Sequence, residues 1–290
     1  MIGWLRVGFV AFVLTAMTLL LWPLQNLAMA RGWKLARRLP HWWHVVACKI
    51  TGLRVTVKGR PSADHPLLIA ANHQSWADIM VMGRIMPLSF IAKAEVREWP
   101  AFGLLARLQR TVFVERGDRR RTGEQADAIA ERLNQGDVMV LFAEGTTSDG
   151  NEALPFKTAL FGAAQAALRQ ADTHAVRVQP VSIAYTAANG LPLGRLFRPL
   201  VAWPGDVPLG PHLLAFLREG AIDAEVTFGE PLLFDAASDR KLVARTAEAR
   251  VAQMLATSLR GHREAANDGA GRGESDCRLA PGRDGGDIGT

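Results

Sequence analysis

Residues 7–30 form a run of 24 residues without a charged side chain, with Arg6 before it and Arg31 after it. As a single α-helix this run would be about 36 Å long, which is enough to cross the hydrocarbon core of a bilayer. The run therefore predicts an N-terminal helical segment that associates with a membrane and is joined to a globular remainder.

Two other interpretations of this run stay open. Ala28-Met29-Ala30 resembles a signal-peptide cleavage site, although the apolar stretch is longer than a usual signal core and Trp22-Pro23 interrupts it. The run could also be a helix that lies in the membrane interface or re-enters the bilayer, kinked at the proline. Its length favours retention in the membrane over cleavage.

Basic residues are concentrated after the run rather than before it. The residues that follow it are Arg31, Lys34, Arg37 and Arg38, whereas only Arg6 and the amino terminus precede it. By the positive-inside rule, this asymmetry predicts a bacterial-type inner-membrane protein whose C-terminal part faces the cytoplasm.

Two tryptophans flanked by two histidines follow just beyond these basic residues. Trp42 and Trp43 are suited to the headgroup layer of a membrane. His41 and His44 could be metal ligands at positions i and i+3, but no third ligand is evident nearby. We therefore predict an interfacial amphipathic helix without a metal, which completes an N-terminal region of residues 1–50.

Composition limits the class of the remaining chain. Hydrophobic residues make up 49% of the sequence, enough for a full core, and the net charge of +6 suits an anionic membrane or an anionic substrate. Nucleic acid is not expected as a partner, because no zinc-finger spacing or ribonucleoprotein-type aromatic motif is present. The two cysteines, Cys48 and Cys277, do not suggest a structural disulfide, which suits a reducing compartment. From residue 261 the apolar content falls, which predicts a disordered tail over 261–290.

Apolar runs alternate with helical patterns between residues 51 and 260. Strands are expected at 53–57, 67–71, 89–92, 111–114, 138–142, 176–184 and 224–228. Helices are expected from the turn after 71 to about 86, and at 98–108, 119–134, 156–169 and 240–259. This alternation predicts one α/β domain whose sheet is covered by helices on both faces.

Polar clusters follow three of the predicted strands. They are residues 72–78, Glu115-Arg116 and residues 144–148. Functional side chains gather where strands end in such sheets. The first cluster contains His73 and Asp78, and a histidine beside a carboxylate can remove a proton from a hydroxyl. Residues i and i+5 do not share a helix face, so the two can meet only if the histidine lies on the turn before the helix.

Taken alone, a histidine and an aspartate at this spacing occur often by chance. Ser75 is an alternative nucleophile, although two residues away in a turn is poor geometry for a serine–histidine pair. Arg116 could pair with Asp118 on the surface, and Glu144 could be an ordinary turn residue. Other motifs in the chain decide between these possibilities.

Four motifs in a fixed order carry a family resemblance that covers residues 53–231. Asn72, His73 and Asp78 match N-H-x4-D, and residues 142–148, Phe-Ala-Glu-Gly-Thr-Thr-Ser, match F-P-E-G-T-R-S. The other matching residues are Lys93, Glu95, Pro100, Gly103, Phe113 and Arg116, then Pro155-Phe156-Lys157, Val178-Gln179-Pro180-Val181 and Gly229-Glu230-Pro231. In these motifs the chain resembles the phospholipid/glycerol acyltransferases, of which the 1-acylglycerol-3-phosphate acyltransferases are the best known.

The resemblance implies a fold and a mechanism. The fold would be a mixed sheet covered by helices, as in a glycerol-3-phosphate acyltransferase-like domain. His73 would be the general base that activates a hydroxyl to attack an acyl thioester directly, and Asp78 would orient it. The acyl donor would be an acyl-CoA or acyl carrier protein thioester, with no cofactor or metal. The residues expected to bind substrate are Asn72, Lys93, Arg116, Glu144, Gly145, Thr146, Thr147 and Lys157.

The chain departs from the family pattern at two positions. Ala143 replaces a proline, which affects only loop stiffness, and Thr147 replaces an arginine that in the family helps to hold the acceptor's phosphate. A neutral hydroxyl cannot supply that charge. Lysophosphatidic acid is still expected first as acceptor, because Arg116 remains, and lyso-ornithine lipid, whose headgroup is an amino acid, is the alternative.

Two further hypotheses belong to other classes. The chain could be a catalytically inactive, membrane-anchored lipid-binding protein, although intact His73, Asp78 and Glu144 oppose this. If residues 1–30 were a cleaved signal, the chain could be an exported hydrolase. The sequence gives no oligomeric state.

Overall fold

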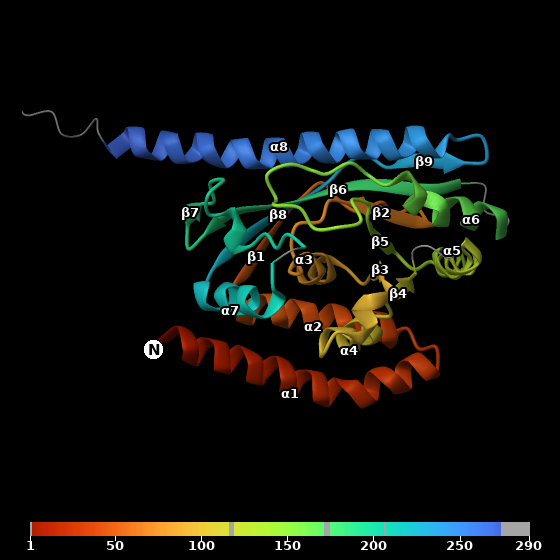
Figure 1. The fold of residues 1–290 in the computed structure, drawn as a ribbon, viewed down its shortest axis with the longest axis horizontal. Coiled ribbons are helices and arrows are strands. Elements are labelled where there is room, and N and C mark those ends of the chain that lie inside the picture. The colour runs from red at the N-terminus through yellow and green to blue at the C-terminus, as the bar shows by residue number, and fades with distance from the viewer. Residues whose placement is uncertain (1, 116–118, 171–174, 206, 274–290) are drawn as a thin grey trace, which may run out of the picture.

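A mixed β-sheet lies between two layers of helices in the computed structural model, which describes residues 2–115, 119–170, 175–205 and 207–273 (Figure 1). The strands are β1 Leu53–Lys58, β2 Leu67–Ala71, β3 Ser89–Lys93, β4 Val112–Val114, β5 Met139–Phe142, β6 Ala175–Ala188, β7 Leu191–Pro192, β8 Ile222–Phe228 and β9 Leu232–Asp235. The helices are α1 Ile2–Ala30, α2 Leu35–Thr51, α3 Asp78–Ile85, α4 Phe102–Leu108, α5 Arg119–Asn134, α6 Gly162–Gln170, α7 Leu209–Glu219 and α8 Arg240–Gly273. Short 3-10 turns are η1 Ala94–Glu98, η2 Thr158–Phe161 and η3 Arg198–Leu200.

The strand order is β1-β8-β6-β2-β5-β3-β4, with β7 and β9 also paired to β6. Strands β2, β3, β4 and β5 run parallel to one another, and β6 is parallel to β2 but antiparallel to β8. The mixed sheet covered by helices is therefore confirmed. Because β2 lies between β5 and β6, its carboxyl end opens beside the ends of both neighbours, where the polar clusters were expected.

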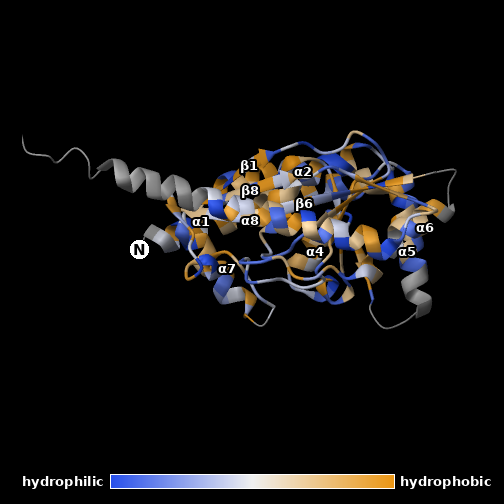
Figure 2. Ribbon diagram, turned by 90° about the horizontal axis from the view of Figure 1, so that it is seen from above, coloured by the Kyte–Doolittle hydropathy of each residue, from blue (hydrophilic) through white to orange (hydrophobic). Residues whose placement is uncertain are grey.

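Alternate residues of β2 enter two separate cores. Leu67 and Ile69 pack toward α2, α3 and α7, whereas Leu68 and Ala70 pack toward α5, α6 and α8. All four side chains are fully buried, which explains why this strand reads as a continuous apolar run. Figure 2, seen from above, shows α8 lying across β8 and β6.

Helix α1 lies along the domain instead of standing away from it (Figure 1). Near its start, Arg6 donates hydrogen bonds to the carbonyl oxygens of Leu217, Thr51 and Gly220 at 2.8–3.0 Å. Near its end, the Gln25 amide donates to the carbonyls of Ala36 and Leu108. Both ends of α1 are thus tied to the same body as the sheet.

The outer side of α1 remains apolar and uncovered. Only 11% of the most apolar 18-residue stretch of α1 is buried. By length and composition the helix could cross a membrane. Its large exposed side chains include Phe9, Phe12, Leu19 and Leu20. Since α1 packs against α2 and α7, and Val7 and Val10 also enter the core, the N-terminal region packs as part of the domain. The predicted boundary at residue 50 stays a prediction.

Some elements differ from those expected from the sequence. The predicted helix at 98–108 begins only at Phe102, because Pro100 cannot donate a helical hydrogen bond and restricts the residue before it, and the short turn η1 precedes it and ends at Glu98. Strand β6 is longer than expected at both ends, and α7, β7 and β9 were not expected. Helix α8 continues to Gly273, into the segment predicted to be disordered, where alanine, arginine and glutamate favour helix. The rest of that segment lies outside the described residues.

The contact between α2 and α3 requires glycine at position 83. A Cβ atom added to Gly83 would lie 2.2 Å from Cδ2 of His44. We expect Gly83→Ala to lower the free energy of unfolding by about 1–3 kcal/mol, because the packed imidazole must move. Gly8→Ala is the matched control, since nothing lies within 4 Å of its added Cβ and alanine favours helix. Equal free energies of unfolding for Gly83→Ala and Gly8→Ala in detergent would show that the contact between α2 and α3 does not require glycine at position 83.

Candidate active site

His73 and Asp78 meet at the carboxyl end of β2. The Nδ1 atom of His73 lies 2.7 Å from Oδ2 of Asp78. Because a carboxylate accepts hydrogen bonds, Nδ1 carries the hydrogen, and Nε2 is the atom left to take a proton. The histidine lies in the turn before α3, as the five-residue spacing predicted, and the aspartate is the first residue of that helix rather than a residue one turn inside it.

The backbone of the turn folds around the Asp78 carboxylate. The amide groups of Gln74 and Ser75 donate to Oδ2 at 2.8 and 3.0 Å, and the phenol of Tyr185 donates to Oδ1 at 2.8 Å. Asp78 is fully buried, and it sits at a helix N-terminus, where negative charge is favoured. The carboxylate is therefore held in one orientation in the interior rather than free to move at the surface.

Glu144 holds the backbone of the same turn from the other side. Its Oε2 accepts the amide hydrogen of His73 at 3.0 Å, and its Oε1 accepts that of Leu154 at 2.8 Å. Burial raises the pKa of Glu144 to about 8, against the lowering effect of these two backbone hydrogen bonds. Glu144 is 1% exposed and contacts the histidine backbone, so it supports His73 from behind.

Asn72 and Ser75 are also buried. Asn72 accepts a hydrogen bond from the amide of Ile183 and donates one to its carbonyl, which fixes the end of β2 against β6. The hydroxyl of Ser75 accepts a hydrogen bond from the Ala77 amide, and its side chain is fully buried. This placement opposes a nucleophilic role for Ser75.

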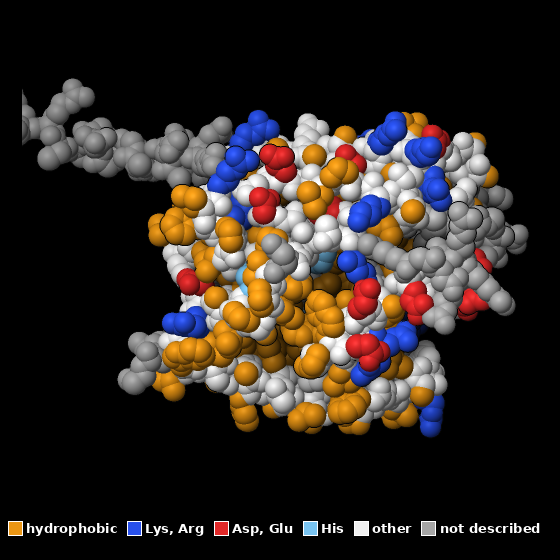
Figure 3. Space-filling view, in the orientation of Figure 1, with side chains coloured by type: hydrophobic (Ala, Val, Ile, Leu, Met, Phe, Trp, Pro, Cys, Tyr) orange, Lys and Arg blue, Asp and Glu red, His pale blue; other side chains and the backbone are white. Residues whose placement is uncertain are grey.

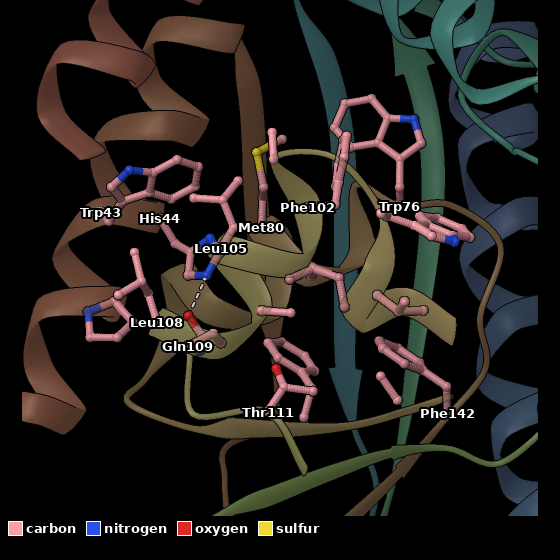
Figure 4. Close-up of a pocket in the computed structure, with 18 of the residues that line it drawn as sticks. Trp43, His44, Trp76, Met80, Phe102, Leu105, Leu108, Gln109, Thr111 and Phe142 are labelled. Atoms are coloured by element: carbon pink, nitrogen blue, oxygen red, sulfur yellow. Dashed lines mark hydrogen bonds between the residues drawn. The ribbon is translucent and has the colours of Figure 1, made fainter. Parts of the chain in front are cut away.

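A large apolar cavity opens beside His73. Its volume is about 770 Å³, and its walls come from α1, α2, α3, β3, α4 and the turn after β5. In Figure 4, Trp76 and Phe142 lie at one side of this space, and Trp43, His44, Leu108 and Gln109 lie at the other. The His73 ring stacks on Phe142 with centroids 4.0 Å apart. The space-filling view shows the apolar hollow between α1 and the loops above it (Figure 3).

The two histidines of α2 have protein partners. His44 Nε2 lies 2.8 Å from Oε1 of Gln109, and burial lowers the pKa of His44 to about 4. His41 Nδ1 lies 2.9 Å from the carbonyl oxygen of Gly83. These contacts join α2 to α3 and to the end of α4.

The turn after β5 brings three predicted substrate-binding residues to the cavity. Gly145, Thr146 and Thr147 line it together with His73. Gly145 has φ +70°, a left-handed conformation that favours glycine. The Thr147 side chain is half-buried, and it faces Gly205 across the mouth of the cavity.

The remaining predicted substrate-binding residues are more dispersed. Lys93 is exposed at the end of β3 and lines the cavity, and it also lines a smaller neighbouring pocket with Glu95 and Glu115. Lys157 is exposed, and it does not belong to the residues that line the cavity. Arg116 lies outside the described residues.

Two residues at the site were missed by the sequence analysis. Tyr185 falls one residue beyond the predicted strand, in a stretch where both neighbours are also buried and no alternation marks its direction. Trp76 lies inside the N-H-x4-D motif, where its side chain lines the cavity and its indole donates to Nδ1 of His212. A wider reading of the motif would have included Trp76, whereas only the fold brings Tyr185 to Asp78.

Ionisation of Glu144 should make stability depend on pH. The folded state keeps this proton to about pH 8, whereas the unfolded state loses it near 4.5, so the folded state binds more protons between these values. Stability contributed by this group therefore falls as pH rises through that window. We expect the thermal midpoint of the wild type to fall relative to that of Glu144→Gln from about pH 5 to 8.

Circular dichroism of detergent-solubilised protein would measure these midpoints. Glu152→Gln is the control, because its side chain is 80% exposed. If the thermal midpoints of the wild type and of Glu144→Gln change by the same amount from about pH 5 to 8, the raised pKa of Glu144 is wrong.

Comparison with known proteins agrees with this geometry. Residues 53–184 match the family described as Acyltransferase. The chain is 54% identical to a lyso-ornithine lipid O-acyltransferase of Brucella abortus, over 90% of this chain and 98% of that protein. It is 49% identical to one of Rhizobium meliloti, over 93% and 92% of the two chains. A 1-acyl-sn-glycerol-3-phosphate acyltransferase of Neisseria meningitidis is 43% identical over 41% of this chain and 47% of that protein.

The fold also has a counterpart among solved structures. The crystal structure of the 1-acyl-sn-glycerophosphate acyltransferase of Thermotoga maritima has a TM-score of 0.55 and 19% identity, and the match covers 85% of this chain and 96% of that chain. At this identity the likeness concerns the fold alone. Together with the sequence matches over nearly the whole chain, it shows that this protein belongs to the acyltransferase family.

Proposed function

We propose that this enzyme transfers an acyl chain from an acyl thioester to the hydroxyl group of lyso-ornithine lipid, with His73 as general base. The observation that carries the proposal is a buried His73–Asp78 pair at the wall of a large apolar cavity. The pair supplies a proton acceptor, and the cavity supplies a place for an aliphatic chain. The acyl donor, an acyl-CoA or acyl carrier protein thioester, is a substrate, and no cofactor is needed.

The reaction follows from the tautomer of His73. Nε2 removes the proton from the acceptor's hydroxyl as its oxygen attacks the thioester carbonyl. The tetrahedral intermediate then expels the thiolate, which takes the proton from the imidazolium, so an ester and a free thiol are formed. Asp78 stabilises the imidazolium between the two steps. General-base assistance of this kind contributes roughly 10²–10⁴ in rate.

The cavity is suited to the aliphatic part of the substrates. Leu14 and Trp22 of α1, Trp43 of α2 and Leu105 of α4 supply apolar wall, and burial of each methylene contributes about 0.8 kcal/mol. One end of the cavity is at His73, where the thioester carbonyl must lie. An acyl chain that extends from that carbonyl along these walls would be removed from water.

Two observations support lyso-ornithine lipid as the acceptor. The Brucella and Rhizobium relatives, which match 90% and 93% of this chain, are named lyso-ornithine lipid O-acyltransferases, whereas the 1-acyl-sn-glycerol-3-phosphate acyltransferase of Neisseria matches under half of it. At the cavity mouth, Thr147 offers a hydroxyl where the family pattern has an arginine. This reverses the order expected from the sequence, in which lysophosphatidic acid came first.

The membrane supplies the acceptor. The uncovered apolar side of α1 fits a lipid bilayer, and both ends of α1 are tied to the domain, so we infer contact along the helix rather than a span that stands clear of the domain. The basic residues after α1 and the use of a thioester donor support a location of the domain at the cytoplasmic face of a bacterial-type inner membrane. Because α1 forms part of the cavity wall, removal of a signal at Ala30 would open the site, which opposes the exported-hydrolase hypothesis.

Acyl transfer by the purified full-length protein tests the proposal. Labelled acyl-CoA and acyl carrier protein donors would be combined with lyso-ornithine lipid or lysophosphatidic acid in detergent. We expect transfer to lyso-ornithine lipid, and a loss of roughly 10²–10⁴ in kcat for His73→Ala, because the base is removed. The exposed His65 provides a matched control, and His65→Ala should retain activity.

The other outcomes are equally informative. Preference for lysophosphatidic acid would overturn the assigned acceptor but not the reaction. Equal activity of the wild type and His73→Ala would exclude His73 as the base. A folded wild type that transfers to neither acceptor would favour the lipid-binding hypothesis.

Position 147 should affect the choice of acceptor. Thr147→Arg places a guanidinium at the cavity mouth, and its paired charge-assisted hydrogen bonds favour a phosphate. We expect the ratio of kcat/KM for lysophosphatidic acid to that for lyso-ornithine lipid to rise by about tenfold. Thr146→Arg controls for charge alone, because Thr146 lines the same cavity one residue away. An unchanged ratio in Thr147→Arg would count against this role.

A further inference from the structure

Tyr185 contacts the catalytic carboxylate from a different element of the fold. It lies on β6, is fully buried, and donates its phenolic hydrogen to Oδ1 of Asp78 at 2.8 Å. Burial and the neighbouring Asp78 raise the pKa of Tyr185 above its usual value, so the phenol keeps its hydrogen. Its oxygen also interacts with the Ser75 side chain.

The two carboxylate oxygens of Asp78 accept hydrogen bonds from different parts of the fold. Oδ2 accepts hydrogen bonds from His73, Gln74 and Ser75, all within the turn. Oδ1 accepts from Tyr185, which reaches it from the sheet, 107 residues along the chain. The phenol therefore sets the rotation of the carboxylate that directs Oδ2 at the imidazole.

We propose that Tyr185 is a positioning residue for the acyl transfer, which holds the Asp78 carboxylate in plane with His73 and limits its basicity. This inference rests on the proposed role of His73 as base. Tyr185 does not line the cavity, so it acts through Asp78 and does not touch substrate.

The hydrogen bond has an electrostatic effect as well as a geometric one. A donor to a buried carboxylate draws charge away from it, which weakens its attraction for the imidazolium of His73. Without the phenol, the imidazolium forms more easily, and a larger fraction of the enzyme is protonated at a given pH. Since the base must be neutral to act, the acid limb of the pH–rate profile then moves to higher pH.

A purely structural role predicts a different result. Tyr185 also packs in the core between β6 and α3, and a phenylalanine ring would fill nearly the same space. If Tyr185 only filled space in the core, loss of its hydroxyl would change the stability of the protein and leave the pH dependence of acyl transfer unchanged. The pH profile of transfer therefore separates the two roles.

The first arm of the test is Tyr185→Phe in full-length detergent-solubilised enzyme. We expect kcat to fall by about tenfold while KM for donor and acceptor stays within about twofold, because the affected group acts in the transition state. The acid limb of kcat should move upward by about half a pH unit or more. Thr186→Val is the matched control, since Thr186 is a buried hydroxyl on the same strand that bonds the Asp223 carbonyl. It should leave the acid limb in place.

The second arm uses the fact that the sequence contains one tyrosine. Growth on 3-fluorotyrosine therefore modifies position 185 alone and preserves its shape. The fluorinated phenol is a stronger donor, so the acid limb should move in the opposite direction, to lower pH. This arm remains decisive if Tyr185→Phe does not fold.

Shifts of opposite sign in the two arms support the proposal. A pH profile that is unchanged in Tyr185→Phe or in the fluorinated enzyme would overturn it, and would leave a structural role for Tyr185. His73→Ala in the same assay identifies a failure of the proposed function. If that variant retains activity, the base is wrong, whereas an inactive His73→Ala with unshifted profiles removes only the role of Tyr185.

Discussion

The buried Asp78 carboxylate is the interaction on which the arrangement of the site depends. An uncompensated charge in a protein interior is costly, so its position requires the imidazole, two backbone amides and a phenol to surround it. Those partners come from the turn after β2 and from the strand β6. The same set of hydrogen bonds therefore stabilises the fold locally and orients the imidazole of His73.

The sheet provides the frame that brings these partners together. The parallel strands β2 and β5 end side by side, which places Glu144 behind the His73 backbone. The parallel pair β2 and β6 places Asn72 beside Ile183, and Tyr185 follows two residues later. The register of β2, β5 and β6 therefore sets the relative positions of Glu144, Asn72 and Tyr185. A slip of one residue in β6 would turn the phenol to the opposite face of the sheet.

The sequence predicted the alternating fold and the His73–Asp78 pair, because apolar runs and turn spacing are local properties. It assigned Glu144 and Asn72 to substrate, whereas in the structure both contact the protein backbone. A motif shows that a residue type belongs near a site, but not which partner it binds. Tyr185 could not be predicted, since its partner is distant along the chain and β6 lacks alternation there. Helix α7 was not predicted; Pro208 and Pro211 lie at its start, where proline is tolerated in a first helical turn.

Helix α1 has two different surfaces, an outer one that is apolar and uncovered and an inner one that forms part of the cavity wall. A shortened chain that began after this helix to gain solubility would therefore lose part of its substrate pocket. It would also expose the apolar core beside Val7 and Val10 to water. Solubility and an intact cavity are therefore opposed in this enzyme, because the helix that forms part of the cavity wall also carries the uncovered apolar surface.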